Sequence, residues 1–155
     1  MPGYQISAAD QGTGLLPWSW AAERLAGSHD YWVATVRPDG RPHVMPVWGA
    51  WDGSALWFSS SPGSRKARNL DRDPRATVTT DNPSEPVVLE GSVTRVTDRD
   101  GNAAFAALVN AKYGTDYAVD FFLANATFRL RPRLAFGLLQ ADFTGSPTRW
   151  EFDPG

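Results

Sequence analysis

The sequence predicts a mainly β protein, a small closed or half-closed β-barrel decorated by helices. Short stretches rich in Val, Thr and aromatic residues recur at hairpin spacing, with turn-forming residues between them. Helical stretches interrupt this pattern without alternating regularly with the strands. A parallel α/β sheet is disfavoured, because most neighbouring strands lack a helical crossover between them. The 155 residues suffice for a sizeable core, and we expect one domain over 1–155.

Composition excludes several functional classes. The chain has no cysteine, which excludes disulfides, thiolate metal sites and cysteine nucleophiles. Its net charge of −2 provides no overall field that would recruit nucleic acid. No apolar run reaches the length of about 18 residues that a membrane span needs. The first residues lack the basic and apolar regions of a signal peptide. We therefore expect a cytoplasmic protein.

The N-terminal third predicts an arm, a helix and an antiparallel meander. Residues 1–16 are polar and contain glycine, so we expect a loose arm. The stretch 17–26 predicts a helix, because Pro17 suits its first turn and Gly27 its end. Pro-Asp-Gly-Arg and Trp-Asp-Gly-Ser turns then separate three strands. These strands are predicted over residues 31–37, 42–50 and 55–60.

Pro46 is an unusual residue for the middle of a strand. Proline cannot donate a hydrogen bond to a neighbouring strand. We therefore expect the second strand to be at a sheet edge, bulged, or facing a ligand at this point. An edge strand without a ligand explains the proline as well as a ligand-facing strand does.

The second half of the sequence predicts further strands and helices. A short basic helix follows Ser64 and stops at Asp73-Pro74. Thr97-Asp98 is typical of a helix cap and Gly114 of a helix end, so we expect a helix between them. Another helical piece is predicted over 115–123. Strands are predicted over 75–80, 87–96, 126–131 and 133–140, with a break at Pro132 and a tail over 143–153.

Hydroxyl groups and cations meet where the third strand ends and the basic helix begins. The chain there runs through serines at 59–61, a Pro-Gly break, Ser64 and the cations Arg65, Lys66 and Arg68. A helix N-terminus attracts anions through its unpaired N–H groups, and a guanidinium can grip phosphate with two hydrogen bonds. This arrangement is that of a phosphate clamp for a cofactor, although short basic helices are common and the stretch alone does not select this interpretation. A capped, solvated surface helix has the same composition and remains the alternative.

Aromatic residues are prominent, with seven tryptophans in the chain. Such side chains fill cores, subunit interfaces or the surroundings of aromatic cofactors. Trp48 and Trp57 are candidates for lining a cofactor ring or for filling the barrel. Four aromatic residues are candidates for a substrate mouth, for core packing or for dimer contacts: Tyr113, Tyr117, Phe121 and Phe122.

A set of short motifs in residues 32–98 resembles the FMN-binding split-barrel superfamily, which includes pyridoxamine 5′-phosphate oxidase. The motifs occur in order and at the spacing of that family. They are Ala34-Thr35, Asp39-Gly40-Arg41-Pro42-His43, Pro46-Val47-Trp48, Leu56-Trp57-Phe58-Ser59-Ser60, Ser64 to Leu70, Asp73-Pro74-Arg75-Ala76 and Glu90-Gly91. The resemblance implies a six-stranded antiparallel split barrel. It also implies a homodimer with two cofactor sites at the subunit interface.

The resemblance also implies which residues bind the cofactor. Arg65 and Lys66 match the phosphate-binding pair, and Ser59 and Ser60 match strand-end residues that touch the phosphate or ribityl chain. The strand over 44–48 matches the one whose backbone runs along the tricyclic ring. The candidate cofactor-binding residues are Val44, Met45, Pro46, Val47, Trp48, Ser59, Ser60, Ser64, Arg65 and Lys66.

The choice of cofactor is indicated by the end of the chain. Thr148-Arg149-Trp150 resembles the actinobacterial members that use the deazaflavin coenzyme F420. This favours hydride transfer from reduced F420 to a conjugated or activated small molecule. An FMN-dependent oxidase or reductase and a non-catalytic flavin-binding carrier are the alternatives. No catalytic residue is identified, and His29 and His43 have no acidic partner at a spacing typical of a metal site.

Overall fold

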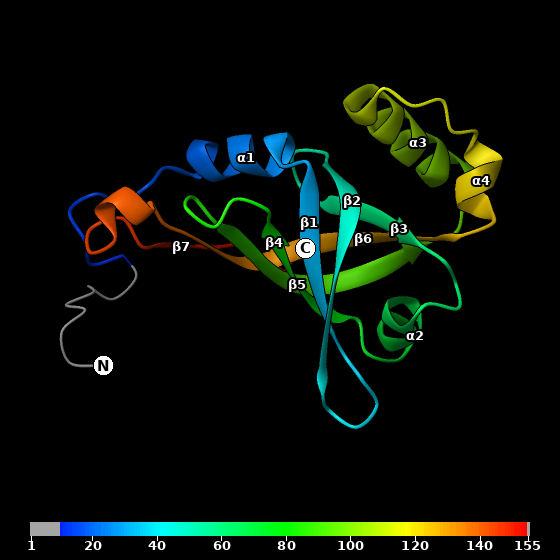
Figure 1. The fold of residues 1–155 in the computed structure, drawn as a ribbon, viewed down its shortest axis with the longest axis horizontal. Helices are drawn as coiled ribbons and strands as arrows, with labels where there is room; N and C mark the ends of the chain where they lie inside the picture. Colours follow the sequence, from blue (N-terminus) through cyan, green and yellow to red (C-terminus); the bar gives the residue numbers. More distant parts are fainter. Residues whose placement is uncertain (1–9, 155) are drawn as a thin grey trace.

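The computed structural model describes residues 10–154 and confirms the mainly β fold (Figure 1). Six antiparallel strands close into a barrel, and a further strand and several helices are attached to it. The strands are β1 (Asp30–Val36), β2 (Pro42–Trp51), β3 (Leu56–Ser60), β4 (Arg75–Thr80), β5 (Val87–Val96), β6 (Ala126–Gly137) and β7 (Thr148–Glu151). The helices are α1 (Trp18–Gly27), α2 (Arg65–Arg72), α3 (Arg99–Tyr113), α4 (Val119–Leu123) and the 3₁₀ turn η1 (Gln140–Asp142).

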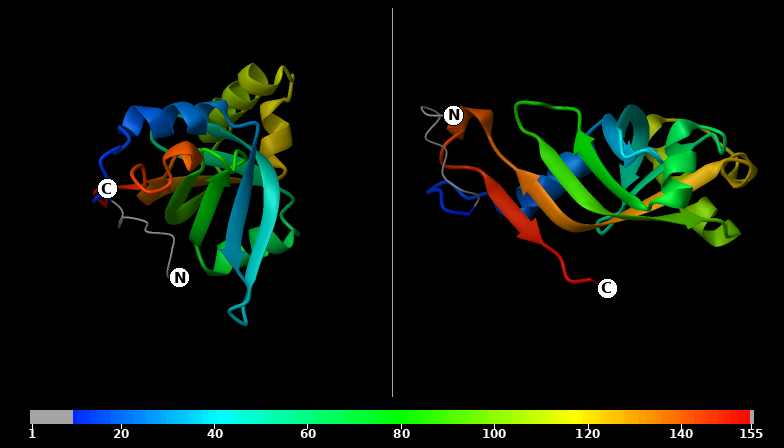
Figure 2. Two further views of the ribbon diagram at one scale, coloured as in Figure 1. Left: turned by 60° about the vertical axis from the view of Figure 1, so that its left-hand side comes forward. Right: turned by 90° about the horizontal axis from the view of Figure 1, so that it is seen from below.

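Pairing between β3 and β6 closes the barrel. The strands follow the order β3-β2-β1-β4-β5-β6-β7, and every pair is antiparallel. The β1–β2 and β2–β3 connections turn at Gly40 and Gly53, whose φ angles of 87° and 100° favour glycine. Figure 2 shows β7 at one end of the molecule and α3 and α4 at the opposite end.

Pro46 lies at an open edge, as one of the three expectations required. It pairs with Trp32 of β1 on one side. On its other side β2 pairs with β3 only from Gly49 to Trp51, so no strand among the described residues faces Pro46 there. The missing N–H therefore breaks no ladder, and this half of β2 is accessible from one side.

Two clusters of buried side chains hold the fold together. The larger one fills the barrel, where Tyr31, Phe58 and Phe128 are almost fully buried. The smaller one lies outside the barrel wall and packs α3 and α4 against it. Trp57 belongs to this second cluster and stacks on Phe105 with 6.0 Å between ring centroids. Trp57 is therefore buried beneath α3 and does not fill the barrel itself.

The prediction of two strands over 126–131 and 133–140 was wrong. Residues 126–137 form the single strand β6, and the 3₁₀ turn begins at Gln140. Pro132 is accommodated because the β5–β6 register shifts beside Gly91, which pairs with Pro132. Such a bulge releases the ladder hydrogen bond that proline cannot donate.

The segment over 143–153, predicted as a tail, contains β7. This strand pairs with residues 134–137 of β6 and extends the sheet beyond the barrel. Residues 1–9 of the predicted N-terminal arm lie outside the described residues. Residues 10–16 are hydrogen-bonded to the C-terminal segment, through Asp10 N to Pro147 O and Leu16 N to the Thr148 hydroxyl. This part of the arm is therefore anchored.

The helices follow their local signals. Asp98 caps α3 by accepting a hydrogen bond from Gly101 N, and Gly114 ends it in the left-handed conformation. In the part of the chain that the structure describes, no helix has both the length and the apolarity to cross a membrane.

Candidate cofactor site

A cavity of about 300 Å³ lies between the β2–β3 side of the barrel and the α3–α4 helices. Its barrel side carries most of the predicted cofactor-binding residues, from the open half of β2, the end of β3 and the first turn of α2. Its helical side is mainly aromatic. The lining residues are Pro46, Val47, Trp48, Ser59, Ser60, Ser61, Lys66, Phe105, Val109, Tyr117, Phe121, Phe122 and Asn125.

Serine hydroxyls organise the polar end of this cavity. The Ser64 Oγ accepts a hydrogen bond from Ala67 N at 3.1 Å, which caps α2 where the Pro-Gly break lets the chain turn. The Ser60 Oγ lies 2.9 Å from the Ser64 Oγ. The Nζ of Lys66 donates to the Ser60 Oγ at 2.9 Å. The helix cap, the strand end and the ammonium group thus form one connected set.

Lys66 carries a charge into a buried position without a counter-charge. The residue is only 8% exposed, and no acidic group within residues 10–154 forms an ion pair with it. Burial lowers the pKa of the Lys66 ammonium below its usual value. A buried charge is costly unless it is paired. An anion such as a phosphate would supply that pairing, so the polar end of the cavity fits the phosphate of a cofactor.

His43 lies within reach of the charges of this region. Its Nδ1 is buried and has no hydrogen-bond partner. Burial, followed by the charges of Arg37, Lys66 and Arg65, lowers the pKa of His43. A phosphate nearby would also offset the crowding of Arg37, Arg65 and Lys66 around this imidazole.

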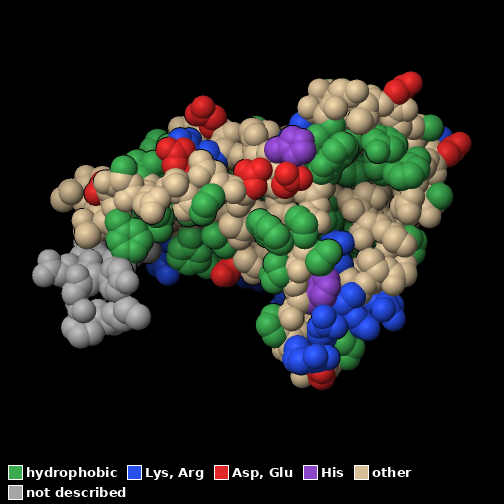
Figure 3. Space-filling view, viewed as in Figure 1, with side chains coloured by type: hydrophobic (Ala, Val, Ile, Leu, Met, Phe, Trp, Pro, Cys, Tyr) green, Lys and Arg blue, Asp and Glu red, His purple; other side chains and the backbone are tan. Residues whose placement is uncertain are grey.

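Arg65 is separated from its neighbour in the sequence. It lines a small cleft of about 200 Å³ with Arg37, Asp39 and Arg41, at the turn between β1 and β2. Consecutive residues of a helix point about 100° apart, so Arg65 and Lys66 cannot both enter one narrow cavity. Figure 3 shows Lys and Arg side chains gathered over the β1–β2 hairpin and α2. The predicted phosphate pair is therefore split between the cavity and the adjoining cleft.

The sequence family described as pyridoxamine 5′-phosphate oxidase matches residues 21–141. The chain belongs to this split-barrel family. The resemblance carried by the motifs is thus confirmed, and the match extends beyond them through α3, α4 and β6. No curated protein sequence matches the chain.

Solved structures with the same family fold are similar to this protein. An F420 reductase is 28% identical with a TM-score of 0.62, covering 77% of this chain and 98% of its own. A conserved hypothetical protein from Mycobacterium tuberculosis is 20% identical with a TM-score of 0.73, covering 96% and 98%. A heme binding protein from Mycobacterium smegmatis is 22% identical with a TM-score of 0.60, covering 86% and 62%. The last two comparisons show the fold alone.

Four of the ten predicted cofactor-binding residues do not line the cavity: Ser64, which caps α2, Arg65, Val44 and Met45. The side chains of Val44 and Met45 are 50% and 49% exposed and do not line it. They precede Pro46 on the open half of β2, where the strand runs away from α3 and α4. Val44 shares a face of the β1–β2 ladder with Trp32, which is 48% exposed, and the two form an apolar surface there, whereas Met45 lies on the opposite face beside Val33.

The helical side of the site was only partly predicted. Tyr117, Phe121 and Phe122 were candidates for a substrate mouth, and all three line the cavity. Phe105 and Val109 line it as well, although their helical spacing is equally typical of core residues. Tyr113 does not line the cavity, and its contacts are described below. No sequence signal identifies Asn125, whose Nδ2 donates to the Phe121 carbonyl at 2.8 Å.

Proposed function

We propose that this protein is an oxidoreductase that transfers a hydride from reduced coenzyme F420 to a conjugated or activated small molecule. The observation that carries the proposal is the buried ammonium of Lys66, which has a hydrogen bond to Ser60 but no counter-charge among the described residues, at one end of an aromatic-lined cavity. When bound, the deazaflavin supplies two-electron hydride chemistry, which needs no catalytic triad from the protein.

The residues of the chain would bind and orient the cofactor. Lys66 and Ser60 would hold the phosphate, and Arg65 would approach it from the adjoining cleft. The stretch 46–48 would lie along the tricyclic ring. The aromatic side chains of α4 would exclude water and offer flat surfaces to a conjugated substrate.

F420 is favoured over FMN by the similarity to an F420 reductase, at 28% identity over 77% of the chain. An FMN-dependent oxidase or reductase is the alternative that the family description supports. A non-catalytic flavin carrier would use the same clamp and the same ring surface. Turnover separates the last two possibilities, because a carrier binds its cofactor without reoxidising it when substrate is added.

We further propose that the working unit is a homodimer. At about 300 Å³ the cavity is at the small end of ligand sites, which span about 300–1,000 Å³. The exposed apolar surface of Trp32 and Val44 lies on β1 and the open half of β2, where Pro46 on the same face lines the cavity. A second subunit seated there would bury this surface and enlarge the cofactor site.

Fluorescence titration of the purified protein with F420, and in parallel with FMN, tests the cofactor. We expect a micromolar Kd for F420 and weaker binding of FMN. Substrate-dependent reoxidation of reduced F420, measured with conjugated acceptors, then tests for an enzyme. Binding of neither cofactor would refute the redox function.

Replacing Lys66 tests the clamp. We expect Lys66→Gln to weaken cofactor binding by about 1.5–3 kcal/mol, roughly 10- to 150-fold in Kd, because one charged phosphate contact is lost. Arg68→Gln is the matched control, since Arg68 lies on the same helix, is exposed and does not line the cavity. Equal losses in the two variants would indicate a general charge effect and contradict the clamp.

A further inference from the structure

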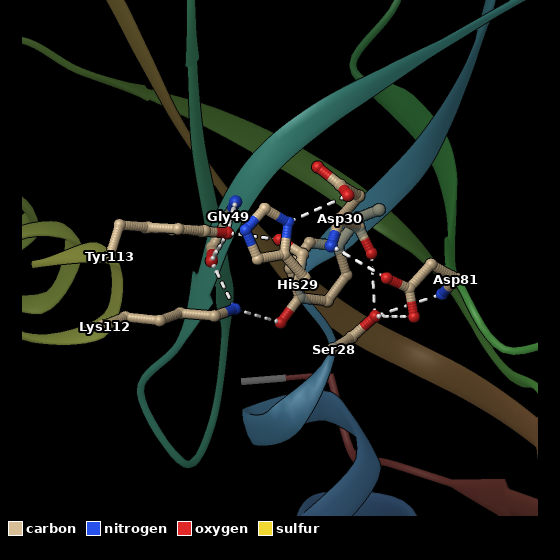
Figure 4. Close-up of polar contacts among 8 residues, drawn as sticks. Ser28, His29, Asp30, Gly49, Asp81, Lys112 and Tyr113 are labelled. Carbon is tan, nitrogen blue, oxygen red and sulfur yellow. Dashed lines mark hydrogen bonds and ion pairs between the residues drawn. The ribbon is translucent and has the colours of Figure 1, made fainter.

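A polar cluster at the C-terminal end of α3 connects this helix to the barrel next to Trp48. It lies outside the cavity and joins Lys112 and Tyr113 of α3 to Gly49 of β2 (Figure 4). The cavity itself is enclosed between β2 and the α3–α4 helices. The contacts of this cluster therefore act on the distance between the two sides of the candidate site.

Tyr113 makes the contact with the cavity wall. Its ring stacks on Trp48 with 4.1 Å between centroids and an interplanar angle of 5°. Its hydroxyl donates to the His29 carbonyl at 2.6 Å and accepts from Gly49 N–H at 3.0 Å. The tyrosine is thus held at its polar end by two backbone groups, while its face supports the tryptophan.

Lys112 holds the same strand from the neighbouring position. Its Nζ donates to the Gly49 carbonyl at 2.7 Å and to the Tyr31 hydroxyl at 2.9 Å, and it lies 4.6 Å from the centroid of the Tyr31 ring. Burial lowers the pKa of Lys112 to about 8. Both hydrogen-bond acceptors are uncharged, so the lysine connects helix and strand without forming an ion pair among the described residues.

Trp48 depends on these contacts more than a core residue would. It is 43% exposed and lies next to the open edge of β2. Its ring contacts within residues 10–154 are with Tyr113 and His29. The interior of the barrel therefore does not fix its orientation, although it lines the cavity.

Gly49 is needed for the close packing of β2 against Tyr31 and β3 at this point. A Cβ atom there would lie 2.9 Å from Cδ2 of Tyr31 and 3.0 Å from the Trp57 carbonyl oxygen. Both N–H and C=O of Gly49 are used by α3 side chains, so the strand offers its backbone to the helix at this residue.

We propose that Tyr113 and Lys112 are positioning residues, which hold Trp48 as a wall of the cavity and thereby set the affinity for the ring of the cofactor. This inference rests on the proposed function for the identity of the ligand. The placement of Trp48 is a property of the free protein and can be tested separately.

The first test observes Trp48 without any ligand. The protein is labelled with fluorotryptophan, and the ¹⁹F signal of Trp48 is assigned with Trp48→Phe. We expect Tyr113→Leu and Lys112→Met to shift or broaden this signal, and Tyr113→Phe to restore it because the stacked ring is kept. An unchanged signal in Tyr113→Leu overturns the inference.

The matched control is Asn102→Ala at the other end of α3. Asn102 is 1% exposed and donates to the carbonyls of Val96 and Asp98, so its loss loosens the helix without touching Trp48. We expect the Trp48 signal to keep its position in this variant. The same shift in Asn102→Ala would mean that docking of the helix alone matters, and would overturn a specific role for Tyr113 and Lys112.

The second test measures binding of whichever cofactor, F420 or FMN, the wild-type protein binds. We expect Tyr113→Leu to weaken binding about five- to tenfold, as for loss of an aromatic stack. In Tyr113→Leu/Lys66→Gln the two losses should multiply, because the ring and phosphate ends are independent. Full affinity in Tyr113→Leu overturns the inference. Absence of binding in the wild type refutes the proposed function instead, while the Trp48 signal still decides the placement.

Discussion

At the scale of single residues, the two lysines of this protein are unusual: Lys66 is buried and Lys112 half-buried, and neither forms an ion pair within residues 10–154. Lys66 and Lys112 each donate to neutral groups in the described part of the chain. Their environments differ in one respect: Lys66 lines a cavity, and Lys112 is enclosed by protein groups. An external anion can therefore compensate Lys66, whereas at Lys112 burial lowers the pKa and the charges of Asp81 and Asp30 offset it only in part.

The pKa of Lys112 makes stability depend on pH. The pKa is about 8 in the folded state, against 10.5 for an unperturbed lysine. Below pH 8 both states carry the proton. Between about pH 8 and 10.5 the unfolded state holds it and the folded state does not, so stability rises with pH. Burial raises the pKa of Tyr31. Above about pH 10 the unfolded state therefore loses the Tyr31 proton while the folded state keeps it, and this lowers stability as the pH rises.

We therefore expect the free energy of unfolding of the wild type, relative to Lys112→Met, to increase from pH 7.5 to 9.5. The slope cannot exceed about 1.4 kcal/mol per pH unit, the value for a difference of one proton. Urea unfolding at several pH values measures it, and the contribution of Lys66 cancels because both proteins contain this residue. A difference that stays constant over this range would show that Lys112 keeps its proton.

Side-chain direction limits what can be predicted for single residues. Lys66, Ser59 and Ser60 were predicted from a contiguous motif, and the structure places them in one cavity. Arg65 belongs to the same motif but faces a different cleft, because neighbouring helical residues diverge. Residue type and spacing indicate the chemistry of a site, whereas the helix geometry decides which member enters it.

At the scale of elements, strands bounded by turn chemistry were predictable and strands bounded by tertiary contacts were not. The β1–β2 turn is encoded by Pro38-Asp39-Gly40, so both strands were located from the sequence. Pro132 is a strand breaker in any local interpretation, yet β6 continues through it. It does so because the bulge opposite Gly91 lies on another strand, which no local pattern reveals.

The bulge predicts a strict requirement for glycine at residue 91. A Cβ atom there would lie 2.1 Å from the Arg131 carbonyl oxygen, so β5 and β6 would have to separate. We expect Gly91→Ala to lower the free energy of unfolding by about 2–4 kcal/mol. Urea unfolding measures this loss.

Gly27→Ala is the control for that measurement. Nothing lies within 4 Å of a Cβ placed on Gly27, which ends α1. Its effect should stay within about 0.5 kcal/mol, as for a surface substitution. Comparable stability of the two variants would show that the β5–β6 pairing tolerates a side chain at the bulge.

At the scale of the whole molecule, the site combines parts that are far apart in the sequence. The barrel side comes from residues 46–66, and the helical side comes from residues 105–125. The ordered motifs predicted the first part because they are local, and they also indicated the barrel that positions it. The second part depends on α3 and α4 folding back over β2 and β3, held by the outer cluster around Trp57 and by Tyr113.

The exposed face of β1 and β2 leads to the last prediction, which concerns assembly. Trp32 and Val44 expose apolar side chains on the same face of the β1–β2 ladder, and contiguous apolar patches commonly mark protein interfaces. In the proposed homodimer Val44 would be buried, so Val44→Glu would place a carboxylate in an apolar interface. We expect this variant to sediment as a monomer while its circular dichroism stays unchanged. Cofactor binding should weaken with it, because each site would lose the surface of the second subunit.

Leu15→Glu provides the comparison, since Leu15 is 48% exposed but lies in the N-terminal segment. A Val44→Glu protein with the sedimentation coefficient of the wild type would place the interface elsewhere, or show that the cavity of one chain is the complete site.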